Sequence, residues 1–290
     1  MKAVKLKFKT PVRIGDRGIG LESVSEVIHS DTLFSAIANA LSDLNEDVVE
    51  FVEKVSNGEL RISSAFPFKR DEYYLPAPVK PYEKKVDPFV PKDVFEDLLI
   101  YNEVDREIEK EKPYKEFELP KVAVDRITAN TSIYYVSLLK FDDGGFYFLI
   151  EGNGRRLIEL ALRYLADDGI GGKRTWGLGR FEFEFTDFSL KTPKDSNAFV
   201  TLSVVFPQNL KSIAFWKPLI RGGWTFSRKG KQIRKPVIIM ASEGSVFGEE
   251  EHGKVIDLDE IVKGFSAKVG HKVFVNGKSF LVPAVIEYGN

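Results

Sequence analysis

The first part of the chain switches between two hydrophobic periods. Residues 4–8 alternate apolar side chains with lysines, which predicts a strand with one buried face. An apolar stripe at helical spacing follows over residues 33–44, and Ser30 or Asp31 is placed to cap that helix. Residues 61–68 return to the strand pattern. We therefore expect a strand, a helix and a second strand in that order.

The segment 71–129 interrupts this pattern. Prolines recur between Pro76 and Pro120, and because proline cannot donate to a sheet ladder, they argue against a packed sheet there. A helix is expected over residues 91–101, and the charged run 102–116 is expected to face solvent. We interpret the whole segment as an insertion that leaves the core.

The clearest hairpin signal of the first half follows this insertion. Two apolar runs, 133–141 and 146–150, flank a turn at residues 142–145 that contains two glycines. A helical stripe over 155–166 and a period-two strand over 181–185 come next. Strand, helix, strand, insertion, hairpin, helix, strand is the order of a ferredoxin-like domain with additions.

The second half gives strand signals and little helical pattern. Residues 199–206 and 236–240 read as buried strands. Residues 273–275 and 279–282 flank an Asn-Gly pair, Asn276-Gly277, which predicts a hairpin. We expect this half to be a diverged second domain of the same type.

The expected fold class is therefore α+β, with two ferredoxin-like (RRM-like) domains. The first spans residues 1–190 and carries the insertion at about 71–130 and a glycine-rich loop at 169–180. The second, diverged domain spans residues 191–290.

The glycine-rich loop is the most unusual stretch of the chain. Its sequence from Gly169 is Gly-Ile-Gly-Gly-Lys-Arg-Thr-Trp-Gly-Leu-Gly-Arg, ending at Arg180. Glycine reaches backbone angles closed to other residues, so main-chain N–H groups can approach a ligand closely. Three cations and no carboxylate lie in the loop, which suits an anion site, and the anion most often bound this way is a phosphate.

Nucleotide-cofactor motifs fit this loop poorly. The order is helix, loop, strand, whereas the dinucleotide and P-loop fingerprints need a strand before the loop and a helix after it. Leu178 also stands where the P-loop lysine would be. Trp176 favours a nucleic-acid ligand, because an aromatic face stacks on bases. The alternative is a mobile or tightly packed helix-to-strand turn with Trp176 simply buried, and the loop by itself leaves both open.

Composition excludes several classes of protein. The chain has 290 residues and no cysteine, so disulfides, thiolate zinc sites and a cysteine nucleophile are ruled out. No run reaches the length of a membrane span and the start has no signal-peptide core, so we expect a cytoplasmic protein. We find no carboxylate and histidine cluster at ligand spacing, and we expect neither a metal nor a cofactor.

The net charge of −1 argues against general affinity for nucleic acid, but the charges are segregated. Residues 196–242 contain eight cations and no acid, and residues 243–260 are strongly acidic. Within the basic stretch, Arg221-Gly222-Gly223-Trp224 repeats the combination of cation, glycine and aromatic seen in the loop. One basic ligand-facing surface, or ordinary solvated loops, would each give this pattern.

The glycine loop, extended to Phe181, resembles that of the RAMP superfamily, the repeat-associated RNA-binding proteins of CRISPR systems. Residues 4–15, 28–37, 65–68 and 124–128 resemble its Csm branch. In this order and together with the loop, they are similar to the fourth Csm subunit of type III-A effector complexes along the whole chain. The loop alone would point only to the superfamily.

This resemblance implies a noncatalytic RNA-binding subunit. Such a subunit holds the 5′ repeat-derived handle of a CRISPR RNA (crRNA), docks the large palm-domain subunit and contacts a neighbouring backbone RAMP subunit. It also implies that the insertion acts as a thumb, with contacts to RNA where it returns to the core. The residues expected to bind RNA are His29, Arg126, Thr128, Thr131, Gly171, Gly172, Lys173, Arg174, Thr175, Trp176, Gly177, Arg180, Arg221, Trp224 and Arg228.

Two alternatives remain at this stage. In RNA-cleaving RAMP relatives a histidine near the first helix takes part in acid–base catalysis, and His29 stands just before that helix. The chain would then be a metal-independent endoribonuclease that cuts repeat RNA with His29 as general base. The third reading is a purely structural scaffold without RNA affinity.

Overall fold

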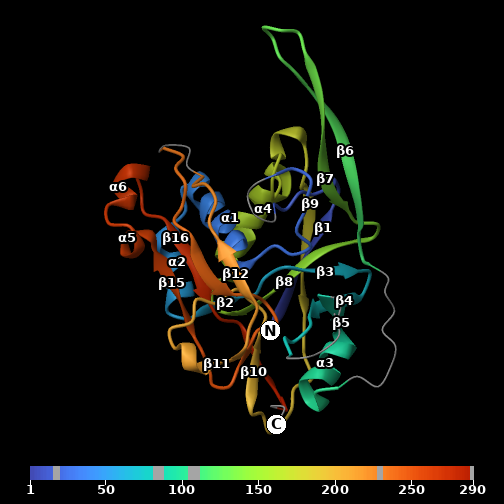
Figure 1. Ribbon diagram of the computed structural model, residues 1–290. Helices are drawn as coiled ribbons and strands as arrows, with labels where there is room; N and C mark the ends of the chain where they lie inside the picture. The colour runs from blue at the N-terminus through green and yellow to red at the C-terminus, as the bar shows by residue number, and fades with distance from the viewer. Residues whose placement is uncertain (16–19, 81–87, 104–111, 227–230, 288–290) are drawn as a thin grey trace.

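The chain folds around one large antiparallel sheet (Figure 1). The computed structural model describes residues 1–15, 20–80, 88–103, 112–226 and 231–287. The sheet has the strand order β5-β4-β3-β8-β1-β9, and β2 pairs with β8 beside β3. Its strands are β1 (Lys2–Phe8), β2 (Leu60–Ile62), β3 (Phe66–Lys69), β4 (Glu72–Pro76), β5 (Phe89–Pro91), β8 (Gly144–Gly152) and β9 (Phe181–Asp187).

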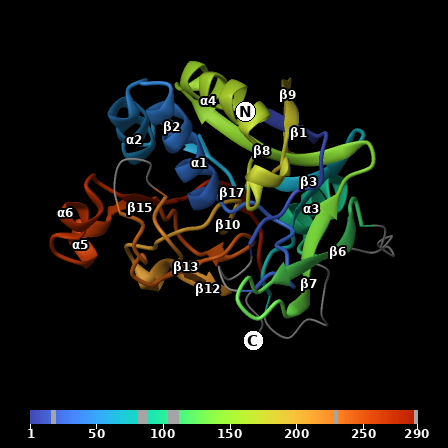
Figure 2. The same ribbon diagram turned by 90° about the horizontal axis from the view of Figure 1, so that it is seen from above.

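Helices cover one face of this sheet, as Figure 2 shows. They are α1 (Ser30–Asp43), α2 (Val48–Ser56) and α4 (Arg155–Asp168). The apolar stripes predicted for α1 and α4 form the core here, with Leu33, Phe34 and Ile37 packed on the same cluster as Leu162. With the intervening elements left aside, the chain order is strand, helix, strand, strand, helix, strand, formed by β1, α1, β2, β8, α4 and β9.

The opposite face packs on α3 (Lys92–Tyr101) and on a second sheet from the C-terminal part. That sheet has the order β11-β14-β10-β17. Its strands are β10 (Ala198–Thr201), β11 (Ile213–Phe215), β14 (Val246–Phe247) and β17 (Leu281–Ala284). Because Phe66 and Tyr147 of the first sheet share a core with Val200 and Phe280, the two halves of the chain are not packed independently.

The C-terminal half departs from the expected second strand–helix–strand unit. Two further strand pairs are β12 (Pro218–Arg221) with β13 (Ile238–Ala241), and β15 (Gly253–Asp257) with β16 (Phe274–Lys278). Its helices among the described residues are short, namely α5 (Leu258–Ile261), α6 (Phe265–Val269) and the single 3-10 turn η2 (Leu210–Ser212). The Asn276-Gly277 hairpin is wrong, because both residues lie inside β16. A Cβ on Gly277 would stand 2.6 Å from the Cβ of Phe206, so this glycine serves close packing.

A long two-stranded ribbon projects from the body (Figure 1). It consists of β6 (Lys115–Val124) and β7 (Thr131–Lys140), paired along their full length. The expected hairpin of 133–141 with 146–150 is therefore wrong, because β7 pairs with β6 while both edges of β8 are taken by β1, β2 and β3. The argument from proline against a packed sheet in segment 71–129 is also wrong, since β4 and β5 extend the main sheet and β6 is a regular strand. The helix expected over residues 91–101 is confirmed as α3.

The first strand is buried on both faces. Lys5, expected on a polar face, is 6% exposed, and its ammonium lies 5.3 and 5.0 Å from the ring centroids of Phe68 and Tyr73. It also lies 3.7 Å from Asp71 and 3.8 Å from Glu184. A buried ammonium needs such partners, and the alternation read from the sequence could not reveal the second packed layer.

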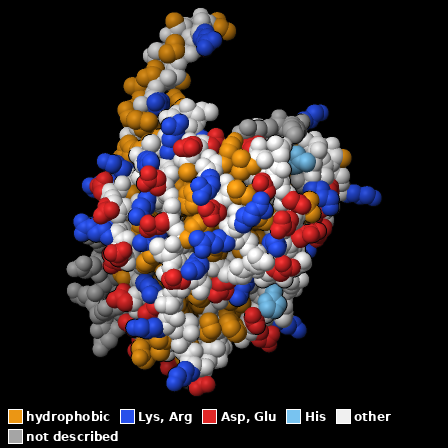
Figure 3. Space-filling model, turned by 180° about the vertical axis from the view of Figure 1, so that it is seen from behind, with side chains coloured by type: hydrophobic (Ala, Val, Ile, Leu, Met, Phe, Trp, Pro, Cys, Tyr) orange, Lys and Arg blue, Asp and Glu red, His pale blue; other side chains and the backbone are white. Residues whose placement is uncertain are grey.

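The face shown in Figure 3 carries acidic and basic side chains interspersed across it. Apolar side chains continue along the projecting ribbon in the same view, where Val122, Val124, Ile127, Ile133 and Tyr135 are exposed. None of the helices described is both long and apolar enough to cross a membrane.

Candidate nucleic-acid interface

The glycine-rich loop joins the end of α4 to β9 and is packed tightly against the chain that follows β1. Gly169, Gly171 and Gly179 have positive φ angles of 89°, 93° and 76°. A Cβ at these positions would meet a main-chain carbonyl oxygen at 2.5, 2.4 and 2.1 Å respectively. These three glycines are thus required by close main-chain packing.

Most amides of the loop are used inside the protein. Main-chain N–H groups donate to main-chain carbonyls from Gly169 to Leu165, Ile170 to Gly179, Gly172 to Arg13, Trp176 to Lys173, Gly177 to Arg174 and Gly179 to Pro11. The Arg180 amide donates to the Thr10 hydroxyl at 3.0 Å. The expectation that the loop presents bare amides to a phosphate is therefore wrong at these positions, and the turn reading explains the glycines.

The tip of the loop presents side chains instead. Residues 174–176 form a 3-10 turn, η1 (Arg174–Trp176), and Trp176 is 39% exposed. The ammonium of Lys173 lies 4.9 Å from the Trp176 ring centroid, and that of Lys121, from β6, lies 4.7 Å from it. An exposed indole flanked by two ammonium groups can stack on a base while the cations neutralise neighbouring phosphates.

Arg174 points the other way, toward the C-terminal half. Its guanidinium forms an ion pair with Asp168 and lies 5.4 Å from the ring centroid of Phe226. Asp168 at the end of α4 is thereby neutralised. Since Lys121 belongs to the ribbon and Phe226 to the C-terminal half, the loop tip connects the two.

A cleft of about 320 Å³ opens beside this tip. One wall is the solvent-facing side of α1, with Thr32, Asn39 and Asp43, and the other is the end of α4 with Tyr164. Arg174 and Phe226 also line it, as do the glycines from 169 to 172. His29 reaches the same cleft from the N-terminus of α1.

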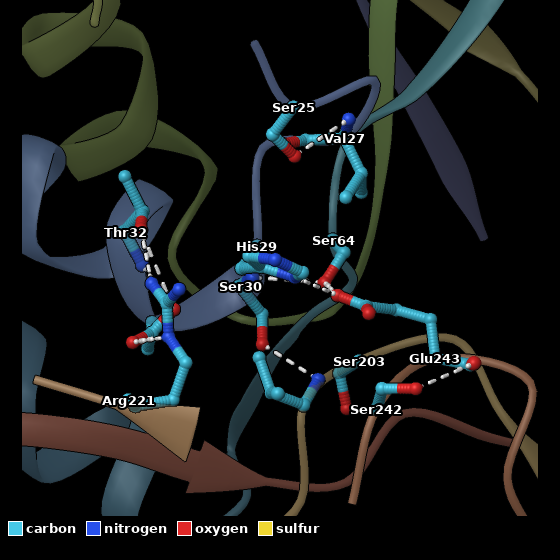
Figure 4. Close-up of polar contacts among 12 residues, drawn as sticks. Ser25, Val27, His29, Ser30, Thr32, Ser64, Ser203, Arg221, Ser242 and Glu243 are labelled. Atoms are coloured by element: carbon cyan, nitrogen blue, oxygen red, sulfur yellow. Dashed lines mark hydrogen bonds and ion pairs between the residues drawn. The ribbon is translucent and has the colours of Figure 1, made fainter. Parts of the chain in front are cut away.

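His29 is held in place by an acid from the C-terminal half (Figure 4). Its Nδ1 lies 2.8 Å from Glu243 Oε1, and the Ser64 hydroxyl donates to the same oxygen. The side chains of His29 and Glu243 are 9% and 6% exposed. Burial alone would raise the pKa of Glu243, but His29 and the Ser64 hydroxyl hold that pKa below its ordinary value. His29 is also the N-cap residue of α1, one position before the expected cap, without a side-chain capping bond.

Asp31 at the start of α1 also contacts the C-terminal half, through Arg221, which Figure 4 shows beside Thr32. Arg221 of β12 donates from Nε to Asp31 Oδ2 at 2.8 Å and from Nη2 to Asp31 Oδ1 at 2.9 Å. It also donates to the Thr32 hydroxyl at 2.8 Å. Burial alone would raise the pKa of Asp31, but Arg221, helped by His29 and Lys235, holds that pKa below its ordinary value. Arg221, expected to face RNA, instead ties β12 to α1 inside the protein.

The remaining expected residues that the structure describes lie in three places. Arg126, Thr128 and Thr131 lie at the far end of the ribbon, not at its return to the core, because β6 and β7 stay paired out to Val124 and Thr131. Trp224 is 64% exposed, and its main chain forms an isolated antiparallel β-bridge with Arg234. Arg228 lies outside the described residues. Thr175 and Arg180 are exposed at the loop.

Sequence reasoning missed Lys121, Phe226 and the cleft itself. The polar residues Thr32, Asn39 and Asp43 recur at helical spacing opposite the apolar stripe of α1, and this was the available signal. No signal could have paired Lys121 with the loop, since that contact depends on the ribbon. Among the residues described, no group of three or more His, Asp and Glu side chains could hold a metal ion.

Models of two known protein families match this chain. A model of the RAMP superfamily matches residues 5–182, and a model of the CRISPR Csm4 C-terminal domain matches residues 194–284. A protein of Thermococcus onnurineus (strain NA1), described as CRISPR system Cms protein Csm4, is 34% identical over 302 residues that cover 96% of this chain and 94% of that protein. The protein of the same description from Methanocaldococcus jannaschii is 27% identical over 372 residues, covering 98% and 97%.

Solved structures give the same result. A chain of the Csm1–Csm4 cassette, crystallised in complex with cA4, is 27% identical with a TM-score of 0.69 and covers 99% of both chains. A chain of the Csm3–Csm4 subcomplex from a type III-A interference complex has the same fold, with 23% identity, a TM-score of 0.69 and coverage of 98% and 99%. On the strength of the superfamily match over residues 5–182 and the 34% identity across nearly the whole length, this chain belongs to the Csm4 family of the RAMP superfamily.

Proposed function

We propose that this chain is a noncatalytic RNA-binding subunit that holds the 5′ repeat-derived handle of a crRNA in a type III-A effector complex. The observation that carries the proposal is the exposed Trp176 with the ammonium groups of Lys121 and Lys173 against its ring. Stacking on an aromatic side chain contributes about 1–3 kcal/mol per base in single-stranded complexes. The two cations supply the phosphate neutralisation that the net charge of the chain lacks.

The proposed partners are the large palm-domain subunit and a neighbouring backbone RAMP subunit. The chain of the Csm1–Csm4 cassette, which is 27% identical to this one, was crystallised with Csm1. This supports the large palm-domain subunit as a partner. The exposed apolar side chains of the ribbon, with Ile127 95% exposed at its end, support a contact beyond this chain for β6 and β7.

The same proposal extends to the domains. The strand order β9-β1-β8-β2 with α1 and α4 on one face supports a ferredoxin-like domain over residues 1–190. Separate family matches to residues 5–182 and 194–284 support a boundary near residue 190. The C-terminal strands would then belong to a second, strongly diverged ferredoxin-like domain over residues 191–290.

The noncatalytic role is favoured by the surroundings of His29. Its Nδ1 is engaged by Glu243, and its side chain is 9% exposed. Acid–base cleavage of RNA needs a base within hydrogen-bond reach of the 2′-hydroxyl and a second group for the leaving oxygen. One observation favours the alternative, an endoribonuclease. Glu243 orients His29 at the edge of the cleft, as a general base requires.

The experiment mixes the full chain with labelled repeat RNA, with guide RNA carrying a 5′ handle and with guide RNA lacking it, in the absence of metal. We expect tighter binding of the handle RNA and no cleavage. Handle-independent binding would contradict the proposal. Specific cleavage that disappears in His29→Ala while binding persists would establish the endoribonuclease instead.

A further inference from the structure

We propose that the guanidinium of Arg13, beneath Gly15 and Gly172, binds a backbone phosphate of the RNA. The inference rests on the proposed function, because Gly172 belongs to the same glycine-rich loop as Trp176. Arg13 lies in the segment between β1 and α1 and is 6% exposed. Both glycines line the cleft beside the loop tip. The cation that receives the phosphate then comes from outside the loop.

Arg13 is a buried cation without an acidic partner among the residues that the structure describes. Its Nη2 donates to the main-chain carbonyls of Gly20 at 2.8 Å and Ser23 at 3.3 Å, and its buried Nε has no partner. Burial lowers the pKa of Arg13, which reflects the cost of holding a positive charge there. Since buried charges are ordinarily paired with an opposite charge, we expect a bound anion to complete this site.

The atom that can receive this anion is Nη1. It carries two N–H groups, and within the described part of the chain it donates to no residue. A Cβ at Gly15 would stand 3.5 Å from Nη1, and a Cβ at Gly172 would stand 4.0 Å from it. Gly15 is exposed, so the space that these absent side chains leave over Nη1 opens to solvent.

Packing of the chain does not require a glycine at either position. Neither Gly15 nor Gly172 has a positive φ, and the closest atom to an added Cβ would lie at an ordinary distance, 3.5 and 3.7 Å respectively. Gly171 differs, because its Cβ would stand 2.4 Å from the Arg13 carbonyl oxygen. Glycine costs conformational entropy on folding, so its presence at 15 and 172 needs another reason. Access of a ligand to Arg13 provides that reason.

A phosphate of the RNA backbone fits this position. Guanidinium groups form strong charge-assisted hydrogen bonds with phosphate oxygens. Lys173 follows Gly172 directly, and its ammonium lies 4.9 Å from the Trp176 ring centroid. A strand that stacks a base on Trp176 would therefore carry its phosphates past Lys173 toward Gly172. A contact to the backbone alone reads no base, so it should act on any RNA sequence that occupies the site.

The test measures binding of labelled guide RNA with a 5′ handle to the full chain at several KCl concentrations, by filter binding. For single-stranded RNA, the slope of log affinity against log salt changes by about 0.7 for each phosphate contact. Arg13→Met should make the slope shallower by about 0.7 and weaken binding at least about tenfold at low salt. Arg70→Met is the charge-matched control, because Arg70 is exposed and pairs with Asp143, and it should leave both quantities unchanged.

A second variant keeps the arginine, because replacing a buried arginine can unfold the chain. Gly15→Ala combined with Gly172→Ala would place methyl groups 3.5 and 4.0 Å from Nη1 without overlap inside the protein. We expect this variant to unfold at the temperature of the unsubstituted chain or slightly above it, and to show the same losses of affinity and slope. If it folds and binds with the original affinity and slope, the inference is overturned. An equal loss in Arg70→Met would also overturn it.

Guide RNAs with one neutral methylphosphonate linkage at successive 2′-O-methylated positions identify the phosphate. Each is compared with the same 2′-O-methylated RNA carrying an ordinary phosphate. One linkage should weaken binding to the unsubstituted chain and have no effect on the double glycine variant. The absence of such a linkage would show that Arg13 does not bind an RNA phosphate. The salt slope can be measured with guide RNA lacking the handle as well, so failure of the handle preference and failure of this inference are distinguishable.

Discussion

Replacing Gly179 with alanine tests whether the glycine-rich loop is built for packing. Gly179 has a φ of 76°, and an added Cβ would stand 2.1 Å from the carbonyl oxygen of Ile170. That contact is with main chain, which cannot move aside as a side chain could. Gly177 provides a matched control in the same loop, because its φ is 80° and an added Cβ would meet nothing within 4 Å.

The two substitutions share one energetic term and differ in another. Both place an L-residue in the left-handed region, at about 1–2 kcal/mol. Only Gly179→Ala adds the steric overlap, and overpacking of this kind destabilises by about 1–3 kcal/mol. Since 1 kcal/mol shifts the midpoint of thermal unfolding by roughly 2–4 °C in a protein of this size class, Gly179→Ala should unfold at least about 2 °C below Gly177→Ala.

The assay is thermal unfolding of both variants and the unsubstituted chain by circular dichroism at one scan rate. A lower midpoint for Gly179→Ala than for Gly177→Ala is the expected result. Equal midpoints would refute the packing explanation, and the glycines would then need a ligand-binding reason.

Three further predictions concern the contacts between the halves and the loop tip. Arg221→Met leaves the Asp31 carboxylate buried without its partner and should lower the free energy of unfolding by about 3–5 kcal/mol in urea titrations; a change below 1 kcal/mol would contradict the buried pair. The pKa values of Asp31 and Glu243 lie below their ordinary values, so their contribution to stability is complete above about pH 5 and is lost as the pH falls through the folded-state values. Urea unfolding measured at and below pH 5 should show this loss of stability. In Glu243→Gln the free energy of unfolding should depend less on pH. Trp176→Ala should weaken binding of the handle RNA by about 5–150-fold in a filter-binding assay. Trp216→Ala is the control, because Trp216 has the same 39% exposure, and it should leave the affinity unchanged.

Periodicity predicted the elements that have one clear apolar face. The stripe 33–44 became α1, the stripe 155–166 became α4 at residues 155–168, and the alternation at 181–185 became β9. These elements pack on a single core, so their pattern in the sequence reports their environment directly. The order of β1, α1, α4 and β9 follows from the same signals.

Partner choice was not predictable from local pattern. The turn at 142–145 suggested that β7 pairs with β8, but β6 pairs with β7 along ten residues and β8 lies at the centre of the sheet. The Asn276-Gly277 signal was overridden in the same way, by pairing of β16 with β15. Strand pairing is a tertiary outcome, since register and neighbours are set by the whole sheet.

The candidate site was predictable in composition and not in geometry. Lys173 and Trp176 were expected at the loop and lie together at its tip. The amides of the loop, the side chain of Arg221 and the position of Arg126 could not be placed, because each depends on what the folded chain brings opposite them. Glycine content indicates close approach but does not say whether ligand or protein makes it.

Photocrosslinking tests the central claim most directly. A guide RNA with 4-thiouridine placed through its 5′ handle would be bound to the full chain, irradiated, and the crosslinked peptides mapped by mass spectrometry. We expect crosslinks to the peptides that carry Trp176 and Phe226, and their loss when the handle is removed. Crosslinks confined to the mixed-charge face of Figure 3, or independent of the handle, would contradict it.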